Sequence, residues 1–459
     1  MPERDDRRLT GTANKAMSEV KKFLGWRVVG AAFGLQFIQA GLLHQAFGAY
    51  VATLAVEKGW SKTALSGGAA LQSLESAILG PILGWICDRF GPQGVIRAGV
   101  LIFGAGFMAL SQIETLAGFY ASVVLIALGS SLCGYFPTTV AVVQWFEKQR
   151  ARALSTMSLG LALGGVAVPL VAVAMQNLGW RTTAFSSGVL IIILGWPLAA
   201  RILRSPEHYG QTVDGHAAVV TVAPAPSAKS IASVGGGTGA VPVPAAVHLP
   251  APSVPTPTVQ REFTAREAMR TRAFWLLSLG HGFALLVVSA VNVHAISHMK
   301  LGLGYTVSQA SLVITLMTVF QLIGVLVGMS IGDRFQKRYV AALCMLMHAI
   351  GLLALTYAFN VTMLVMFAIF HGVAWGLRGP FMQAIRADYF GRRAIGMILG
   401  ISSVIIALGQ IGGPMLAGAM ADVTGDYRIG LTIIALVAAF GSMMFMWAKQ
   451  PELPQRLSH

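Results

Sequence analysis

An arginine in the middle of an apolar run is the residue of this sequence with the most suggestive chemistry. His371, Trp375 and Arg378 are spaced i, i+4 and i+7, which places them on one face of a helix. A guanidinium can hold a carboxylate through two hydrogen bonds, and a nearby indole can pack against the apolar body of the same molecule. This face predicts a binding site for an organic anion. The alternative is an arginine that reaches water at an interface or pairs with a structural partner.

A carboxyl, Glu75, lies in a second apolar run with no basic residue near it. A carboxyl that takes up and releases a proton inside an apolar region is a candidate for proton coupling. The alternative, with equal weight, is a neutral glutamic acid that hydrogen-bonds a neighbouring helix.

Other polar side chains recur inside the apolar runs. His281 and Asn292 are eleven residues apart and so lie near one helix face. No histidine combines with cysteine or carboxylate at metal-ligand spacing, and no nucleotide motif is present, so we expect neither a metal nor a cofactor. Each polar residue could equally serve packing. The further candidates for lining a binding site are His44, Gln45, Tyr135, His281 and Asn292.

The composition limits what can hold these residues. Of 459 residues, 55% are hydrophobic and 11% charged, whereas typical soluble domains carry about 25% charged residues. A soluble core does not absorb this much apolar surface. The composition therefore argues against a soluble enzyme, a disordered chain or a disulfide-stapled secreted domain, and predicts a polytopic membrane protein.

Twelve apolar segments are long enough to cross a bilayer, which takes about 20 residues of helix. Backbone polar groups in lipid must be satisfied within the segment, so these segments are predicted to be helices of an all-α membrane protein. The predicted spans are roughly 27–52, 62–86, 95–112, 116–142, 151–176, 183–202, 272–298, 307–331, 338–358, 361–386, 395–420 and 428–448.

The basic residues are unevenly distributed between the two sides of these spans. Most of the 33 lie on the side that carries both termini, and cytoplasmic loops are enriched in Lys and Arg. We therefore expect both termini in the cytoplasm and no nucleic-acid partner, despite the net charge of +15. The opposite loops hold Lys58, Lys62, Arg181, Lys300 and Arg428.

A segment of different composition, 205–271, separates the sixth and seventh spans. It is rich in Pro, Ala and Gly and has too few large apolar residues for a core. We expect a flexible cytoplasmic linker there. The predicted organisation is a cytoplasmic tail (1–26), a six-helix bundle (27–204), the linker (205–271), a second bundle (272–448) and a cytoplasmic tail (449–459).

The two halves repeat each other at an offset of about 244 residues. Asp-Arg-Phe at 88–90 recurs at 333–335, at the ends of the second and eighth spans. Several matches in one order favour two six-helix halves, an architecture of secondary transporters. Further matches pair Trp145-Phe146 with Tyr389-Phe390, Pro137 with Pro380, and Pro169 with Pro414.

Residues 84–91, Gly-Trp-Ile-Cys-Asp-Arg-Phe-Gly, resemble the loop signature between helices two and three of the major facilitator superfamily. The resemblance covers nearly all of the chain outside the linker and tails. It implies two pseudo-symmetric six-helix halves, with helices one, four, seven and ten around a central cavity. In the turns after helices two and eight, we expect Asp to face a helix N-terminus of the other half and Arg to hold nearby carboxylates. The alternative is a solvated turn. The predicted gating residues are Gly84, Asp88, Arg89, Arg150, Asp333 and Arg334.

Within the superfamily, several motifs resemble those of the bacterial monocarboxylate transporter and oxalate/formate antiporter branch. The branch usually carries an Arg in helix eight, which the matching stretch 319–324 lacks. The motifs are Gly25-Trp26, residues 45–48 (Gln-Ala-Phe-Gly), residues 59–62 (Gly-Trp-Ser-Lys), and Trp145-Phe146 followed by Arg150, Ala153 and Gly160.

These observations predict a secondary active transporter, not an enzyme, that moves a small mono- or dicarboxylate-like anion by alternating access. Protons are the candidate coupling ion, and a monomer in a bacterial inner membrane is expected from the resemblance. Two alternatives stay open: an efflux transporter of amphipathic or drug-like compounds, and a membrane receptor or assembly protein that transports nothing. Two matched gate sequences argue against the second alternative, because a receptor needs no such pair.

Overall fold

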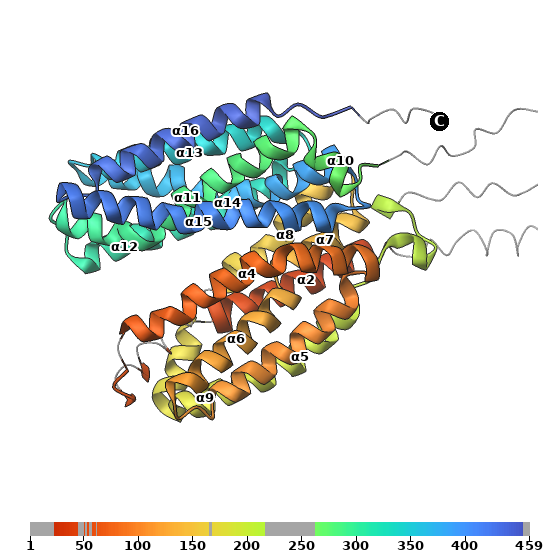
Figure 1. The fold of residues 1–459 in the computed structure, drawn as a ribbon, viewed down its shortest axis with the longest axis horizontal. Coiled ribbons are helices and arrows are strands. Elements are labelled where there is room, and N and C mark those ends of the chain that lie inside the picture. Colours follow the sequence, from red (N-terminus) through yellow and green to blue (C-terminus); the bar gives the residue numbers. More distant parts are fainter. Residues whose placement is uncertain are drawn as a thin grey trace, which may run out of the picture.

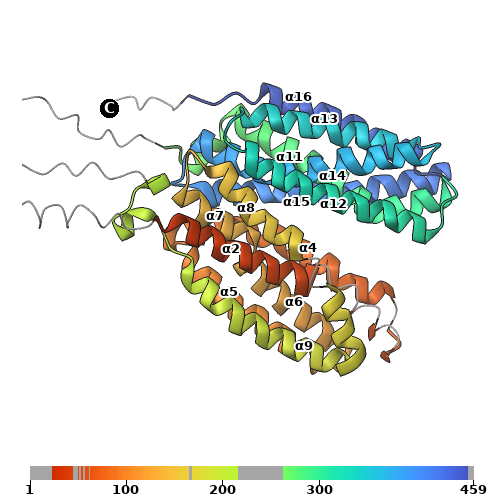
Figure 2. The same cartoon turned by 180° about the vertical axis from the view of Figure 1, so that it is seen from behind.

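The chain forms two bundles of long helices that lie side by side (Figures 1 and 2). A computed structural model describes residues 23–44, 50, 53–54, 57–60, 62–164, 168–215 and 262–452. The C-terminal end of the described chain and both ends of the 205–271 segment lie at one end of the molecule, here called the linker end (Figure 1). The bundles meet there and diverge toward the opposite end.

The N-terminal half contains six spans, two of which are interrupted. Span four is divided between α6 and α7, and span five runs through α8 into the first part of α9. The helix α9 turns at Gly179, whose φ of 77° suits glycine, and continues as span six. The elements are α2 (Gly25–Gln39), η1 (Ala40–His44), α4 (Lys62–Phe90), α5 (Pro92–Leu110), α6 (Leu116–Cys133), α7 (Tyr135–Trp145), α8 (Arg150–Leu163) and α9 (Val168–Arg201).

The C-terminal half contains six long helices. They are α11 (Arg272–Leu301), α12 (Val307–Ile331), α13 (Lys337–Thr356), α14 (Val361–Phe390), α15 (Ile395–Thr424) and α16 (Arg428–Trp447). Among the described residues, ten helices are long and apolar enough to span a membrane. With α4 and the span formed by α8 and the start of α9, this confirms twelve transmembrane helices in two halves.

The linker is described only at its two flanks. The N-terminal flank forms two short turns, η3 (Pro206–Tyr209) and η4 (Val213–Gly215), and the other flank forms α10 (Ala265–Met269). Residues 216–261 lie outside the described residues, so the prediction of a flexible linker stays a prediction there. The first-helix motif at 45–48 also lies outside them.

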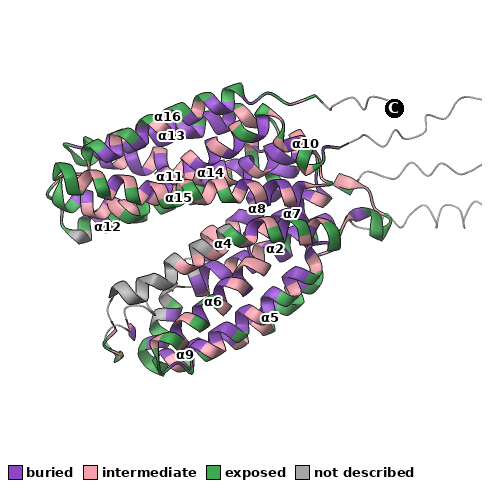
Figure 3. Cartoon of the chain, in the orientation of Figure 1, coloured by how far each residue is buried: buried purple, intermediate pink, exposed green. Residues whose placement is uncertain are grey.

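Buried residues fill the inside of each bundle and gather around α7 and α8, where the halves meet (Figure 3). The core of the N-terminal half includes Leu377, Phe381 and Leu399 of the other half, so one apolar core crosses the interface. Many large apolar side chains point outward, such as Leu312, Leu408 and Met415, each about two-thirds exposed. A bilayer would cover these outward faces.

The break between α6 and α7 at Gly134 shows how a local interruption is stabilised. The break leaves the carbonyl of Ser130 without its usual helical donor, and Gln39 Nε2 donates to that oxygen at 2.8 Å. A Cβ at Gly134 would lie 2.5 Å from the Ser130 carbonyl oxygen and 2.8 Å from Gln39 Nε2. Only glycine therefore fits this close approach.

Candidate functional site

A cavity of about 510 Å³ lies between the halves. Its volume is in the range of small-molecule sites. The wall comes from α2, α4, α6, α7 and α8 on one side and from α11, α12, α14 and α15 on the other. The polar lining residues are Gln36, Gln39, Ser130, Ser131, Tyr135, Thr139, Ser158, His281, Gln321, Arg378, Gln383, Ser403 and Gln410.

Arg378 supplies a positive charge to the cavity wall. It is 2% exposed, and its Nε and Nη1 atoms have no hydrogen-bond partner within the described part of the chain. The described lining residues include no Asp or Glu. An uncompensated guanidinium is costly to bury, on the order of several kcal/mol. The wall is therefore electrostatically complementary to an anion.

The predicted helix face around Arg378 is only partly turned toward the cavity. Trp375 lines the cavity together with Arg378. His371 does not: it is fully buried, and its Nδ1 lies 3.1 Å from Nδ1 of His348 on α13. The structure therefore puts His371 behind the wall, in contact with another helix.

The other candidate lining residues divide in the same way. Tyr135 and His281 line the cavity, and the Tyr135 hydroxyl lies 3.3 Å from Oγ of Ser158. Asn292 is exposed and does not line it. The backbone of His44 belongs to η1, but its side chain and all of Gln45 lie outside the described residues.

Most neutral polar residues of the wall had no strong signal in the sequence. Gln321 lies in the stretch of helix eight that lacks the Arg of the related branch. Gln383 and Gln410 also line the cavity. An amide side chain inside an apolar run was the available signal for a lining residue, because a buried amide needs a hydrogen-bond partner. The same signal also marks amides that hydrogen-bond between helices, so it does not identify a cavity.

A second arginine of α14, Arg386, is buried as deeply as Arg378. It is 1% exposed, and its guanidinium donates to the backbone carbonyls of Met382 (2.8 Å) and Leu277 (3.2 Å). The bond to Leu277 connects α14 to α11. Arg386 is the last residue of the predicted span 361–386 and is not among the candidates predicted from the sequence.

Glu75 lies one side chain away from the cavity. Its Oε2 accepts a hydrogen bond from Oγ of Ser131 at 2.9 Å, and Ser131 lines the cavity. Glu75 itself is partly buried and does not line it. The hydroxyl of Ser131 thus connects the Glu75 carboxyl to the cavity wall.

Two aspartates cap helices of the opposite half at the linker end. Asp88 accepts from the backbone N–H groups of Gly396 (2.8 Å) and Met397 (2.7 Å), in the first turn of α15. Asp333 accepts from those of Ala151 (3.0 Å) and Arg152 (3.1 Å), in the first turn of α8. A carboxylate at a helix N-terminus is favourable. The two aspartates therefore make the predicted contacts with helix N-termini of the other half, and their role in gating stays a prediction.

Close helix packing accompanies the first cap. A Cβ at Gly84 would lie 2.4 Å from the backbone oxygen of Gly396, so α4 and α15 touch backbone to backbone there.

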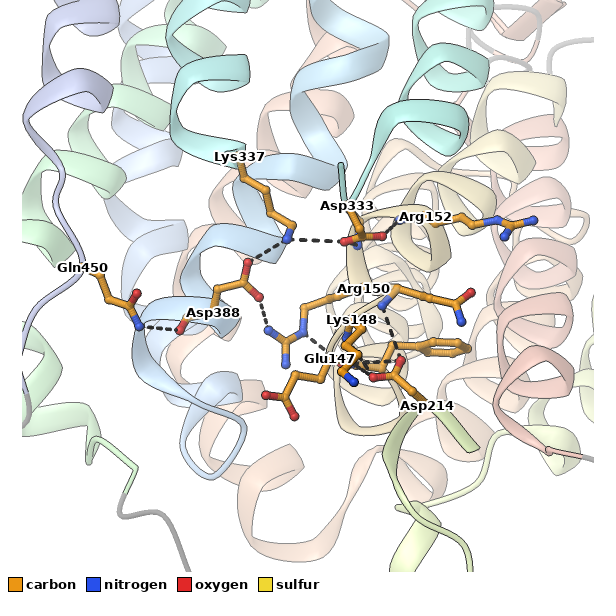
Figure 4. A network of polar contacts seen from close by, with 12 residues as sticks. Glu147, Lys148, Arg150, Arg152, Asp214, Asp333, Lys337, Asp388 and Gln450 are labelled. Carbon is orange, nitrogen blue, oxygen red and sulfur yellow. Dashed lines mark hydrogen bonds and ion pairs between the residues drawn. The ribbon is translucent and has the colours of Figure 1, made fainter. Parts of the chain in front are cut away.

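The ion pairs at the linker end involve Arg150 and Lys337 rather than Arg89 and Arg334, and the pair of Arg150 with Asp388 connects the two halves (Figure 4). Asp388 pairs with Arg150 and with Lys337 (2.9 Å), and Lys337 also lies 3.3 Å from Asp333. Arg89 instead lies over the rings of Trp85 and Phe90 at 5.8 and 5.7 Å. Arg334 is exposed. The carboxylates are therefore held by Arg150 and Lys337, so the expectation for Arg89 and Arg334 was wrong about the partners.

The fold and cavity define a membrane transporter built from two six-helix halves. The family model of the Major Facilitator Superfamily matches residues 29–296 and 277–458. The chain belongs to this superfamily, and its function is transport rather than enzymatic catalysis.

Three similar proteins illustrate this membership. Human monocarboxylate transporter 7 is 22% identical over 430 residues, which cover 88% of this chain and 82% of that protein. The fujikurins efflux protein of Gibberella fujikuroi is 32% identical over 134 residues, so this chain spans only 28% of its length. The solved structure of the E. coli fucose:proton symporter FucP aligns with a TM-score of 0.64 at 13% identity and covers 92% of this chain and 98% of that one.

Proposed function

We propose that this transporter moves a small organic anion across the membrane by alternating access, with Arg378 as the anchor of the anionic group. The observation that carries the proposal is the buried guanidinium at the cavity wall, whose Nε and Nη1 have no hydrogen-bond partner in the described residues. Trp375 beside it offers an apolar surface, and Tyr135 and His281 offer polar groups on the facing and neighbouring walls. Similarity to a monocarboxylate transporter supports this substrate class.

We further propose that transport is coupled to protons through Glu75. The hydrogen bond from Ser131 connects Glu75 to the cavity, and similarity to a fucose:proton symporter supports proton coupling in this fold. His44 remains a second candidate for a proton relay. The basic residues at the linker end support a cytoplasmic location of both termini. The resemblance to the bacterial branch supports a bacterial inner membrane, and a monomer completes the proposal.

Efflux of amphipathic compounds is the second candidate function. The local similarity to the fujikurins efflux protein favours it, as do the apolar lining residues Phe136, Trp375 and Ile406. Such a compound needs no cationic anchor, so the buried charge of Arg378 argues for the anion. A receptor that transports nothing is disfavoured by membership of a transporter superfamily.

Uptake into proteoliposomes tests the proposal. Purified protein is assayed with labelled lactate, pyruvate, malonate and oxalate, and separately with ethidium, with and without a proton gradient. We expect uptake of at least one carboxylate, stimulation by the gradient, and loss of uptake in Arg378→Gln. Ethidium transport that is insensitive to Arg378→Gln, with no carboxylate uptake, would establish the efflux alternative instead.

A further inference from the structure

A carboxylate at the N-terminal end of the linker holds the turn between α7 and α8 (Figure 4). Asp214 in η4 accepts hydrogen bonds from the backbone N–H groups of Glu147 (3.2 Å), Lys148 (2.8 Å) and Gln149 (3.4 Å). Asp214 also has a φ of 60° and is the one non-glycine residue with positive φ in the described part of the chain. Such a conformation is uncommon outside glycine, and Asp and Asn are among the residues that tolerate it. The linker therefore departs from ordinary backbone geometry where it meets this turn.

A second carboxylate, at the other end of the linker, holds the turn between α14 and α15. Glu262 Oε2 accepts a hydrogen bond from the backbone N–H of Arg393 at 2.7 Å. Phe263 next to it packs edge-on against Phe390, with ring centroids 5.5 Å apart, and its N–H donates to the Phe390 carbonyl at 3.3 Å. The linker thus begins and ends on the same kind of contact.

The two turns are equivalent in the internal repeat, but the two carboxylates are not. An offset of 245 residues relates Lys148 to Arg393, and the same offset relates Ala151 to Gly396. Asp214 follows the last span of its half, whereas Glu262 precedes the first span of the other half. Duplication of a half therefore does not explain why both turns carry a linker carboxylate.

Each of these turns leads directly into the N–H groups that form the gate. The turn held by Asp214 continues into Ala151 and Arg152, which donate to Asp333. The turn held by Glu262 continues into Gly396 and Met397, which donate to Asp88. The direction of those N–H groups depends on the shape of the turn before them.

The N-terminal flank also reaches the other half. Glu207 in η3 lies 3.3 Å from Arg392, and Arg392 Nη1 donates to the carbonyl of Gln144 at 2.6 Å. The linker flank therefore contacts both turns at the closed linker end.

We propose that Asp214 and Glu262 are positioning residues for transport: each holds one gate turn in the shape that lets the linker end close. Neither residue lines the cavity or touches substrate. They act through the backbone N–H groups offered to Asp333 and Asp88. Weakening both contacts shifts the transporter toward the state that is open at the linker end.

Thiol accessibility measures this shift without any substrate, so the result is independent of the proposed anion. In protein whose native cysteines are replaced, Gln410→Cys reports access from the opposite end and Leu399→Cys, one turn into α15, reports access from the linker end. Each reporter is combined with Asp214→Asn and Glu262→Gln and labelled with an impermeant maleimide from its own side. Asn also tolerates the left-handed backbone at 214, so the change removes charge without new strain.

We expect the ratio of linker-end to opposite-end labelling to rise about five- to tenfold, the size that follows from loss of two capping carboxylates. Glu267→Gln is the matched control, because Glu267 forms the capping box of α10 with Thr264 on the same flank; it should leave the ratio unchanged. An unchanged ratio in the folded double variant would overturn the proposal. Asp214 and Glu262 would then only stabilise their own turns. If the double variant does not fold, the single variants are read in the same way, and no shift in either would also overturn it.

Discussion

Residues related by the internal repeat are alike at the predicted gate but differ in the cavity. At the gate, one offset of 245 residues relates Asp88 to Asp333 and also relates their partners, Ala151 to Gly396 and Arg152 to Met397. At the cavity, the repeat that pairs Pro137 with Pro380 also pairs Tyr135 with Arg378. Both line the cavity, but one is a neutral hydroxyl and the other a cation.

This difference follows from what each region has to do. In the proposed alternating-access cycle the two gate turns would separate and rejoin together, so equal contacts in both halves would each contribute to closure. The proposed substrate carries an anionic group that must meet a cation on one side of the cavity, and a wall with equal residues in both halves would not provide that difference. The pseudo-symmetric scaffold therefore carries a symmetric gate and an asymmetric binding surface.

The largest expected effect concerns the asymmetric position. Arg378→Gln removes two charge-assisted hydrogen bonds to the anion and should lower kcat/KM for uptake by about 100-fold or more. Arg378→Lys keeps the charge but loses the planar guanidinium that binds a carboxylate through two hydrogen bonds, so its loss of kcat/KM should be smaller. Tyr135→Phe, at the equivalent position of the other half, should cost only a few-fold. Equal losses for Arg378→Gln and Tyr135→Phe, at equal membrane abundance, would show that the cavity is not asymmetric in function.

The second prediction separates proton coupling from binding. Glu75→Gln permanently mimics the protonated side chain and can keep a hydrogen bond with Ser131. Exchange of substrate requires only that the substrate-loaded transporter change between its two open states. Accumulation also requires a proton to bind on one side of the membrane and leave on the other. The variant should therefore exchange labelled substrate at near-normal rates but fail to concentrate it against a gradient. Accumulation equal to that of the parent, with the same pH dependence, would make Glu75 a packing residue.

The third prediction tests the symmetry of the gate. Asp88→Asn and Asp333→Asn each weaken one cap of two charge-assisted hydrogen bonds, so each should shift the balance of open and closed linker end by about tenfold. Because the two caps are equivalent, the two shifts should agree within about twofold. Labelling of Leu399→Cys from the linker side provides the measurement. Strongly unequal shifts would mean that one cap dominates and that the geometric symmetry is not an energetic one.

Sequence patterns predicted the parts of this molecule that repeat or that membranes constrain. Apolar runs predicted the helices, and the duplicated Asp-Arg-Phe predicted the gate aspartates, because both follow from local rules. The ion-pair partners were harder to predict. Arg150 and Lys337, rather than Arg89 and Arg334, hold the carboxylates, and the pair of Arg150 with Asp388 depends on how turns from the two halves meet.

The lining of the cavity could be predicted only in part for a similar reason. Helical spacing places His371 on the face of Arg378, but at the depth of His371 that face packs against His348 of α13. The break at Gly134 depends on Gln39, which is distant in sequence and adjacent only in the fold. The burial of Arg386 depends on the Leu277 carbonyl of α11. Each case requires knowledge of the neighbouring helix, which periodicity does not contain.

The smallest expected effect concerns the middle of the linker. Replacing residues 219–256 with twelve Gly/Ser residues leaves about twenty residues between η4 and Glu262, with a root-mean-square span of about 25 Å. The two turns that the linker ends contact lie close together, since Gln144 Nε2 donates to the Arg392 carbonyl at 3.0 Å, so this tether reaches without tension. The variant retains Asp214, Glu262 and Glu207. Uptake and the labelling ratio should therefore stay within about twofold of the parent, because loop length alone contributes little to the free energy of closure. A large loss of uptake in the well-inserted variant would show that the replaced segment itself takes part in transport; a changed labelling ratio with normal uptake would show that it acts on the gate.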